Sequence, residues 1–424
     1  MKILIVGGGG REHAIAWKLS KENNVEKIYC APGNAGIAKV AQCVNISDSD
    51  IENLVKFAKE NNIDLTVVGP EVPLVNGIVD EFEKKGLKIF GPNKECSTFE
   101  GSKSFSKDFM IRHNIPTAKY KEYTNLDEAI SEIDSFGYPV VIKADGLAAG
   151  KGVVIPEIRE DAINTLKEMM NDKKFGSAGE KIVVEEFLSG IETSILAFVD
   201  NDTIVPMVSA KDHKKVYNFE KGPNTGGMGT FSPSEIYTDE LSKEISEKVL
   251  NRTLQGFKKD KLNYKGILFI GLMITEDGPK VLEYNVRFGD PETQSVLFRL
   301  ETDLHKIMEA ILDNKLKDIE INYKKEEAVC VMLTSGGYPE DYEKGKVITG
   351  LEDLDEDIVV FHSGTKMLDG NLVTNGGRVI GITTSAGSVE EAAKKVYKNI
   401  EKINFEGMHY RTDIGIKFCE EISF

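Results

Sequence analysis

Three polar side chains alternate along one otherwise apolar stretch of the sequence. Glu283, Asn285 and Arg287 are each separated by a single residue. Because successive side chains of a β-strand point to opposite faces, a strand here would carry all three on one face. A carboxylate and an amide oxygen are hard ligands that suit Mg²⁺ bridging phosphates, and a guanidinium pairs with a carboxylate or a phosphate. The pattern therefore predicts a Mg²⁺ site at Glu283 and Asn285, with an ordinary solvated sheet face as the alternative.

A second segment combines lysines with glycines. Lys143 ends an apolar run that begins at Pro139, and Gly146, Gly150 and Lys151 follow it. This is not a Walker loop, because only three residues separate the two glycines and a glycine follows the second lysine. A glycine-rich backbone still suits a triphosphate, since it can close over the phosphates while two ammonium groups offset their charge. The alternative is a solvated loop with two surface lysines.

The first glycine-rich segment, Gly7–Gly10, follows a short apolar run and precedes a helical pattern. Backbone N–H groups at such a helix start bind phosphate. The dinucleotide fingerprint nevertheless fails, because Glu12 stands where a small residue is needed and the second apolar run ends at Ala31 without an acidic residue. The segment favours a phosphate-bearing substrate over a nicotinamide dinucleotide and over a tight turn without a ligand.

The remaining reactive side chains give fewer signals. Of the six histidines, only His213 lies in a polar cluster, which makes it a candidate substrate contact. No serine or cysteine has the context of a nucleophile, so covalent catalysis through the protein is not indicated. The five cysteines are scattered without a C-x-x-C pair, which predicts reduced cytoplasmic thiols and disfavours a disulfide framework or a zinc site.

The elements that must position these residues begin with a Rossmann-like unit. Residues 1–101 alternate short apolar runs with amphipathic segments, which predicts a doubly wound parallel sheet. Turn signals follow the expected strands at residues 7–10, 32–34, 69–70 and 91–92. Because the carboxyl ends of parallel strands form the ligand crevice, these four turns should converge.

The rest of the chain is expected to form three further units. Strands are expected at 139–144, 152–155 and 181–187, and a hairpin is expected to join Gly266–Thr275 to Lys280–Val286. The charged stretch Tyr323–Glu327 is typical of a linker. The predicted boundaries are 1–101, 102–190 with a small lid at about 120–190, 191–325, and 326–424.

Charge and length exclude several classes of partner. The 424 residues correspond to two to four domains at about 150 residues each. Lys and Arg total 53 against 69 Asp and Glu, a formal net charge of −16, which disfavours a nucleic-acid or anionic-membrane surface and confines any phosphate site to a local pocket. No apolar run approaches the ~20 residues that span a bilayer, and the apolar amino terminus is too short for a signal segment. We therefore expect a cytoplasmic protein, with a monomer as the default state.

In chain order, the motifs resemble the ATP-grasp ligases. The resemblance rests on the run 143–152, on Glu185-Glu186-Phe187-Leu188 with Glu192, and on Glu283-x-Asn285. Two longer motifs, Gly222-Pro-Asn-Thr-Gly-Gly-Met-Gly229 and Arg287-Phe-Gly-Asp-Pro-Glu-Thr-Gln294, are similar to the phosphoribosylamine–glycine ligase family, and the likeness covers essentially the whole chain. It implies an α/β and α+β multidomain fold with a Rossmann-like N-terminal domain, an ATP-grasp centre and a small C-terminal α/β domain.

The resemblance also implies an activity. ATP would phosphorylate the carboxylate of glycine, and the amine of 5-phosphoribosylamine would attack this acyl phosphate, giving glycinamide ribonucleotide, ADP and phosphate in de novo purine synthesis. Such chemistry needs positioning and charge neutralisation more than a protein nucleophile. The alternatives are another ATP-grasp carboxylate–amine ligase, a biotin-dependent carboxylase subunit, or a nucleotide-binding protein without turnover.

Site residues are carried over from the family by matching motifs. Lys103 and Lys143 would contact ATP phosphates, residues 185–188 would hold adenine, and Glu192 would hold the ribose. The strand 266–275 lacks a further acidic metal ligand, so phosphates and water would complete the shell of Mg²⁺, or Mn²⁺, at Glu283 and Asn285. The implied ATP contacts are Lys103, Lys143, Gly150, Lys151, Glu185, Glu186, Phe187, Leu188, Glu192, Lys215 and Asn224; the implied substrate contacts are Gly8, Gly9, Gly10, Gly33, Asn34, Glu71, Asp212 (for the glycine ammonium), His213 and Arg287; the implied catalytic residues are Arg287 and Asp290.

Overall fold

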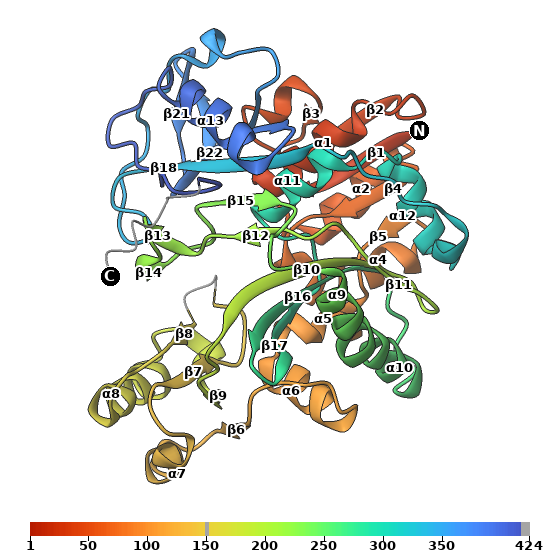
Figure 1. Cartoon of the computed structure of the whole chain (residues 1–424). Helices are drawn as coiled ribbons and strands as arrows, with labels where there is room; N and C mark the ends of the chain where they lie inside the picture. Colours follow the sequence, from red (N-terminus) through yellow and green to blue (C-terminus); the bar gives the residue numbers. More distant parts are fainter. Residues whose placement is uncertain (149–151, 417–424) are drawn as a thin grey trace.

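The apolar runs near the amino terminus form a parallel sheet in the computed structural model, which describes residues 1–148 and 152–416 (Figure 1). The five strands lie in the order β3 (Gln42–Cys43), β2 (Lys27–Pro32), β1 (Lys2–Gly7), β4 (Leu65–Val68) and β5 (Ile89–Phe90). Residues 3–6 of the central strand have no exposed surface, because helices cover both faces of the sheet. This confirms the predicted Rossmann-like unit. Its helices are α1 (Gly10–Leu19), α2 (Ile51–Glu60), α3 (Glu71–Val75), α4 (Ile78–Lys84) and α5 (Lys94–Gly101).

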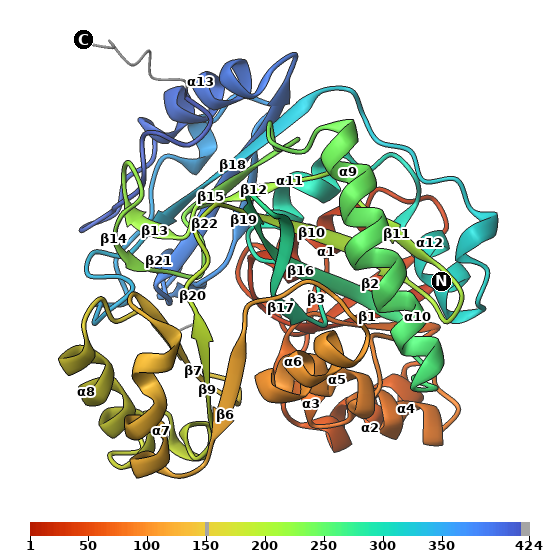
Figure 2. The same ribbon diagram turned by 60° about the horizontal axis from the view of Figure 1, so that its bottom comes forward.

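A small antiparallel sheet follows helix α6 (Lys103–Arg112). Its strands lie in the order β6 (Tyr120–Tyr123), β9 (Ile182–Glu186), β7 (Val140–Ala144) and β8 (Val153–Val154). Figure 2 shows α7 (Leu126–Glu132) and α8 (Arg159–Met170) together on one side of this sheet. Val140 and Ile142 pack against these helices, whereas Val141 and Lys143 point to the opposite side. The alternation leaves one face of this lid unit free to border a cleft.

The central sheet is antiparallel, with its strands in the order β11 (Ile204–Pro206), β10 (Ile191–Val199), β16 (Gly266–Thr275) and β17 (Gly278–Asn285). The predicted hairpin is therefore present as β16 and β17. Helices α9 (Asp239–Ile245) and α10 (Asn251–Lys259) bury their apolar sides against one face of the sheet, and α11 (Glu292–Arg299) and α12 (Leu304–Leu312) pack on the other.

The last sheet contains strands from two separate parts of the sequence. Its order is β12 (Lys211–Asp212), β15 (Gly229–Ser232), β18 (Glu327–Thr334), β22 (Arg378–Ala386) and β19 (Val359–His362). Residues 211–232 fall within the predicted unit 191–325, but β12 and β15 join the C-terminal sheet through the pairing of β15 with β18. The remaining elements are the hairpins β13 (Lys215–Tyr217)–β14 (Lys221–Asn224) and β20 (Thr365–Leu368)–β21 (Asn371–Thr374), and helix α13 (Val389–Ile400).

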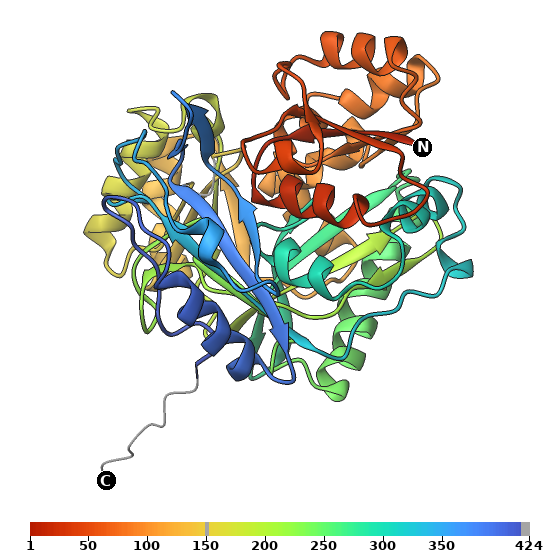
Figure 3. The ribbon, with the colours of Figure 1, turned by 90° about the horizontal axis from the view of Figure 1, so that it is seen from above.

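Helix α11 connects the layers. All of its residues are buried, and it packs against α1, β15, β18 and β22 as well as the central sheet. In Figure 3 this teal helix lies between the red N-terminal unit and the blue C-terminal sheet. Among the described residues, no helix is long and apolar enough to cross a membrane.

Candidate functional site

A cleft of about 570 Å³ lies where the four units meet. The N-terminal unit contributes Arg11 and Glu71 to its walls, and the C-terminal sheet contributes Arg378. Most of the predicted site residues line it: Glu71, Lys103, Lys143, Glu185, Glu186, Phe187, Leu188, Glu192, Asp212, Asn224, Glu283, Asn285, Arg287 and Asp290. Gly150 and Lys151 lie outside the described residues.

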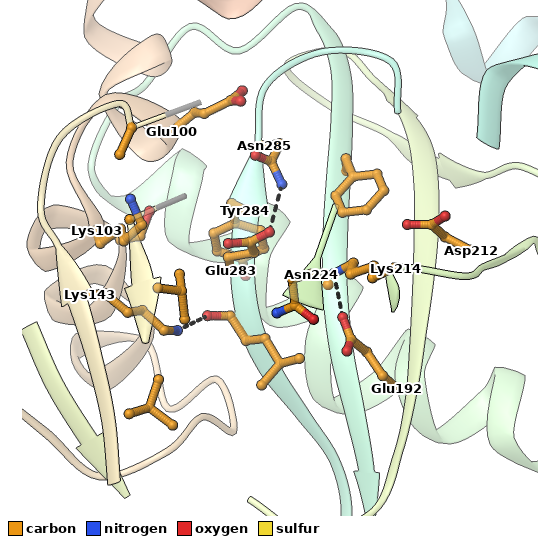
Figure 4. Close-up of a pocket in the computed structure, with 18 of the residues that line it drawn as sticks. Glu100, Lys103, Lys143, Glu192, Asp212, Lys214, Asn224, Glu283, Tyr284 and Asn285 are labelled. Atoms are coloured by element: carbon orange, nitrogen blue, oxygen red, sulfur yellow. Dashed lines mark hydrogen bonds and ion pairs between the residues drawn. The ribbon is translucent and has the colours of Figure 1, made fainter. Parts of the chain in front are cut away.

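Lys143 projects from β7 into the cleft beside a buried carboxylate (Figure 4). Its Nζ lies 2.8 Å from Oε1 of Glu185 and donates to the carbonyl of Leu282 at 3.2 Å. Lys107 of α6 reaches Oε2 of the same carboxylate at 2.7 Å. Burial would raise the pKa of Glu185, but the two ammonium groups outweigh it and keep this pKa below its usual value.

Lys103 enters the cleft at the start of α6. The side chain of Ser102 caps this helix, and the carboxylate of Asp145 accepts the N–H of Ser104 at 2.6 Å. These bonds join α6 to the segment after β7 and place Nζ of Lys103 3.1 Å from the carbonyl of Gly146. Burial lowers the pKa of Lys103. Two lysines from neighbouring elements therefore face the same space, as a polyphosphate site requires.

The alternation along β17 places the predicted metal ligands together. Glu283 and Asn285 face the cleft, whereas Tyr284 between them is buried and its hydroxyl lies 2.7 Å from that of Thr253 (Figure 4). Asn285 Nδ2 donates to Oε1 of Glu283 at 3.3 Å. Burial opposes the charge of Glu283, but Lys214, Lys143 and Lys103 together hold its pKa below the usual value.

The donor set fits a magnesium ion held jointly by protein and nucleotide. One carboxylate and one amide oxygen supply hard oxygen ligands, and Mg²⁺ in phosphate sites takes only one or two such groups from the protein. Among the described residues, no cluster of three or more His, Cys, Asp or Glu side chains forms a closed metal cage. Glu283 and Asn285 would therefore hold an ion whose other ligands come from phosphates and water.

The structure places Lys214, rather than the predicted Lys215, in the cleft. Lys214 pairs with Glu192 of β10, and burial is outweighed by Glu192, Glu283 and Asp212, which raise the Lys214 pKa. Lys215 begins β13, and its carbonyl accepts a bond from Arg411. Adjacent residues of an extended segment point to opposite sides, so a one-residue difference moves the ammonium out of the site.

Arg287 is held between two carboxylates. Its Nη2 lies 2.9 Å from Oε1 of Glu100, and its Nε lies 3.5 Å from Oε2 of Glu71. Glu100 also accepts the N–H of Val286 at 2.8 Å. Burial raises the pKa of Glu100, although Arg287 opposes this shift. The guanidinium is thus fixed at the boundary between the central sheet and the N-terminal unit.

Asp212 and Glu292 form a second carboxylate group beside it. Oδ1 of Asp212 is buried without a hydrogen-bond partner, and Glu292 is 3 % exposed. Burial and the neighbouring Glu292 raise the pKa of Asp212. A buried carboxylate beside a half-buried one whose Oδ1 has no hydrogen-bond partner suits a cation such as an ammonium group.

Two of the four predicted turns, 7–10 and 32–34, lie together, but they do not line this cleft. Asn34 Nδ2 donates to the carbonyls of Gly8 and His362 at 2.9 and 2.8 Å, which ties Gly33–Asn34 to the Gly8–Gly10 turn. The Gly10 backbone lies next to Asp290, which does line the cleft. His213 is also absent from the cleft lining; it is 5 % exposed, and burial lowers its pKa to about 3.

Several cleft residues escaped the sequence analysis. Glu292 lies inside a motif that was recognised, so its position in that motif was an available signal. The other residues belong to no local pattern, and they come from helices, from the C-terminal sheet or, for Lys214, from the segment between β12 and β13. They are Arg11, Glu100, Lys107, Lys214 and Arg378.

Comparison with known proteins agrees with this geometry. Three domain models of phosphoribosylglycinamide synthetase match the chain: the N domain at residues 1–100, the ATP-grasp (A) domain at 101–293 and the C domain at 328–417. The chain belongs to the phosphoribosylglycinamide synthetase family. Members of this family are ATP-grasp enzymes.

Individual members of the phosphoribosylglycinamide synthetase family are similar over their full length. The phosphoribosylamine–glycine ligase of Caldanaerobacter subterraneus subsp. tengcongensis is 52% identical over 98% of this chain and 99% of that protein. The enzyme of the same name from Halalkalibacterium halodurans is 49% identical, with coverage of 99% and 98%. The crystal structure of phosphoribosylamine–glycine ligase from Thermotoga maritima superimposes with a TM-score of 0.85 at 35% identity, covering 98% of this chain and 100% of that one.

The broader ATP-grasp fold reaches beyond this synthetase family. The biotin carboxylase domain of the 2-oxoglutarate carboxylase from Hydrogenobacter thermophilus has a TM-score of 0.73 at 17% identity, covering 96% of this chain and 91% of that one. At this identity the likeness shows the fold alone.

Proposed function

We propose that this chain uses ATP to join glycine to 5-phosphoribosylamine, giving glycinamide ribonucleotide, ADP and phosphate in purine synthesis. The observation that carries the proposal is the single cleft in which Lys103 and Lys143 face Glu283 and Asn285, with Arg287 fixed beside them. Membership of the synthetase family supports the same activity.

The nucleotide would occupy the side of the cleft between the lid and β17. Apolar lining residues on this side, including Val141, Leu188 and Leu282, suit an adenine ring. Lys103, Lys143 and Lys214 would neutralise phosphates, and Glu283 and Asn285 would hold Mg²⁺. When bound, Mg²⁺ would supply charge stabilisation to the transferring phosphoryl group.

Glycine would lie between the phosphates and the carboxylate pair. Asp212 and Glu292 offer the buried acceptors that an ammonium group requires. With the ammonium anchored there, a glycine carboxylate oxygen would attack the γ-phosphorus, and the bond from that phosphorus to ADP would break. Arg287 is placed to stabilise the negative charge of the resulting acyl phosphate.

The second step would occur on the N-terminal side. The amine nitrogen of 5-phosphoribosylamine would form the amide bond to the acyl carbon, phosphate would leave, and the amine would lose a proton. The convergence of Gly8–Gly10 with Gly33–Asn34 next to Asp290 supports a phosphoribosyl site on this side. Asp290 would contact this amine.

A coupled assay of ADP release tests the function. The full chain is incubated with ATP, Mg²⁺ and 5-phosphoribosylamine, together with glycine, bicarbonate or other amino acids, and the product is identified by mass spectrometry. We expect an amide product with glycine alone. Turnover with bicarbonate would favour carboxylase chemistry, and ATP binding without phosphate release under full substrate would favour a nucleotide-binding protein without catalysis.

We further propose that the protein acts in the cytoplasm as a monomer. Cys30, Cys43, Cys96 and Cys330 are free thiols, which suits a reducing compartment. Light scattering of the purified chain across its working concentrations tests the monomer, and a mass twice that of one chain would contradict it.

A further inference from the structure

We propose that Arg378 and Tyr338, both from the C-terminal part of the chain, are positioning residues that clamp the 225–228 loop and Asp290 against the cleft. The inference rests on the proposed function, because it gives the C-terminal sheet a defined part in that reaction. Neither residue was identified from sequence, and neither belongs to the motifs shared with the ATP-grasp ligases.

Arg378 joins two segments that are distant in sequence. It begins β22, and its Nη1 donates to the carbonyl of Gly226 at 2.7 Å and to the carbonyl of Asp290 at 2.8 Å. Its Nη2 lies 3.1 Å from Oδ2 of Asp290. One planar guanidinium thus holds the loop after β14 and the segment before α11 at a constant separation.

Tyr338 contacts the other backbone polar group of the same glycine. The N–H of Gly226 donates to the Tyr338 hydroxyl at 2.9 Å. A Cβ added at Gly226 would lie 3.2 Å from Cζ of Arg378 and 3.3 Å from the Tyr338 hydroxyl oxygen, so the loop backbone lies directly against both side chains. Because the N–H and the carbonyl of one glycine are both engaged, the orientation of the loop is determined by the C-terminal part of the chain.

The clamped loop reaches both halves of the site. Thr225 and Gly226 line the cleft, and Thr225 Oγ1 donates to the carbonyl of Lys214, the residue that pairs with Glu192 on the nucleotide side. The next residue, Gly227, lies so close to Asp212 that an added Cβ would be 2.6 Å from its Oδ1. Displacement of the loop would therefore disturb the nucleotide contacts and the proposed ammonium site together.

Arg378 also controls the charge and orientation of Asp290. Gln294 Nε2 donates to Oδ1 of this carboxylate at 2.8 Å, and Arg378 forms an ion pair with Oδ2. Burial would raise the Asp290 pKa, but Arg378 contributes most to holding it below the usual value. Arg378 thus acts on the amine side through Asp290 and on the nucleotide side through the loop.

The test compares ATP affinity, turnover and chemical rescue in the full chain. Calorimetric titration with MgATP in the absence of glycine should give a Kd about tenfold higher for Arg378→Ala than for wild type, because a charged hydrogen-bond clamp is lost. The kcat with glycine should fall by about a hundredfold, since Asp290 is also released. Added methylguanidinium should restore several-fold activity to Arg378→Ala and none to the control Lys346→Ala, whose ion pairs with Glu343 and Glu406 lie outside the cleft.

A double-mutant cycle covers the case in which Arg378→Ala fails to fold. Tyr338→Phe removes one hydroxyl, and Arg378→Lys keeps the charge but loses the fork. If both side chains hold Gly226, the fold-change in the ATP Kd of the double variant should be smaller than the product of the two single-variant fold-changes. If the fold-changes in Kd multiply exactly, or if both single variants keep the wild-type Kd, the proposal is overturned. The ATP titration is independent of amide formation, so failure of the clamp is distinguishable from failure of the proposed function.

Discussion

Lys107 and Lys143 hold opposite oxygens of the Glu185 carboxylate, at 2.7 and 2.8 Å. Both lysines line the cleft, where Lys143 is 5 % exposed and Lys107 is 2 % exposed. Burial is the main reason that the pKa of Lys107 falls to about 8, while Glu185 opposes the shift. Lys107 thus neutralises one oxygen of Glu185, so that the carboxylate holds Lys143 less strongly and Lys143 can bind a phosphate.

This arrangement predicts that ATP binding depends on the charge of Lys107. Above about pH 8, neutral Lys107 no longer offsets Glu185, so Lys143 is held by the carboxylate and the KM for ATP should rise. In Lys107→Met the KM should be about tenfold higher at neutral pH and should lose the inflection near pH 8. Steady-state kinetics between about pH 7 and 9 measure both effects. The control Lys181→Met, on the lid surface, should retain the inflection in KM near pH 8. An inflection that persists in Lys107→Met would contradict the role of Lys107.

A second prediction concerns the metal ligands. Glu283→Ala should lower kcat by at least ~10², because several kcal/mol of charge stabilisation during phosphoryl transfer depend on the bound ion. Steady-state kinetics at saturating substrates and Mg²⁺ measure the change. The matched control is Glu276→Ala, an exposed carboxylate in the turn of the same β-hairpin, which should leave kcat unchanged. Unchanged turnover in Glu283→Ala would remove Glu283 from this role.

Removal of the metal provides a third prediction. Treatment with a chelator should abolish ADP release, and added Mg²⁺ should restore it in the wild-type chain. Since phosphates complete the proposed ligand set, Mg²⁺ should bind weakly without nucleotide and more tightly with it. Calorimetric titration of Mg²⁺ with and without a non-hydrolysable ATP analogue measures this difference. Equal affinities in the two titrations would argue for an ion held by protein ligands alone.

A fourth prediction separates glycine recognition from ATP recognition. Asp212→Asn should raise the KM for glycine by about tenfold or more, because an amide replaces a carboxylate facing the ammonium group. The KM for ATP should stay within about twofold, since Lys103 and Lys143 are unchanged. Initial-rate measurements with each substrate varied in turn test the split. Equal increases in both constants would indicate a general disturbance of the cleft.

Buried histidines predict acid sensitivity. Burial is the main cause that lowers the pKa values of His13 and His213 to about 3 and of His362 to about 4. In the unfolded chain these histidines are protonated below about pH 6.5, whereas in the native chain they stay neutral until a much lower pH. The free energy of unfolding therefore falls as the pH falls. Each of these histidines should lower the free energy of unfolding by about 2 kcal/mol at pH 5 relative to neutral pH.

Thermal unfolding checks this linkage. Nδ1 of His13 accepts the N–H of His362 at 2.8 Å, so protonation there also breaks a contact between the N-terminal unit and the C-terminal sheet. In His13→Gln, the decline in Tm between about pH 7 and pH 5 should be smaller than in wild type. An equal decline would show that His13 does not contribute to the pH dependence.

Local patterns in the sequence were sufficient for several strands, among them β7, β9 and the β16–β17 hairpin, and for the residues of β17 that share a face. The spacing of Glu283 and Asn285 required no knowledge of distant residues, because a period of two determines the face of a strand once the strand exists. The alternation of Val140 and Ile142 with Val141 and Lys143 followed the same rule. The parallel N-terminal sheet also followed, since buried runs separated by helices form parallel sheets.

Contacts between distant segments could not be predicted in the same way. Lys107 is a helical lysine whose partner Glu185 is remote in sequence, and nothing near Lys107 indicates burial. Arg378 lies in a strand of another sheet and meets Asp290 only after α11 has packed. Lys214 and Lys215 are adjacent, and the direction of an extended segment decides which of the two ammonium groups enters the cleft. Pairing of β15 with β18 likewise depends on tertiary packing.

The complete burial of α11 has a consequence for how this protein can be rearranged. Its residues are covered by the N-terminal unit on one side and by the C-terminal sheet on another, and Glu292 at its first turn opens into the cleft. An exchange of the last hundred residues between relatives would leave this helix facing foreign side chains. Functional chimaeras should therefore take α11 and the sheet that covers it from the same parent, so that the junction between the two parental sequences lies in an exposed loop.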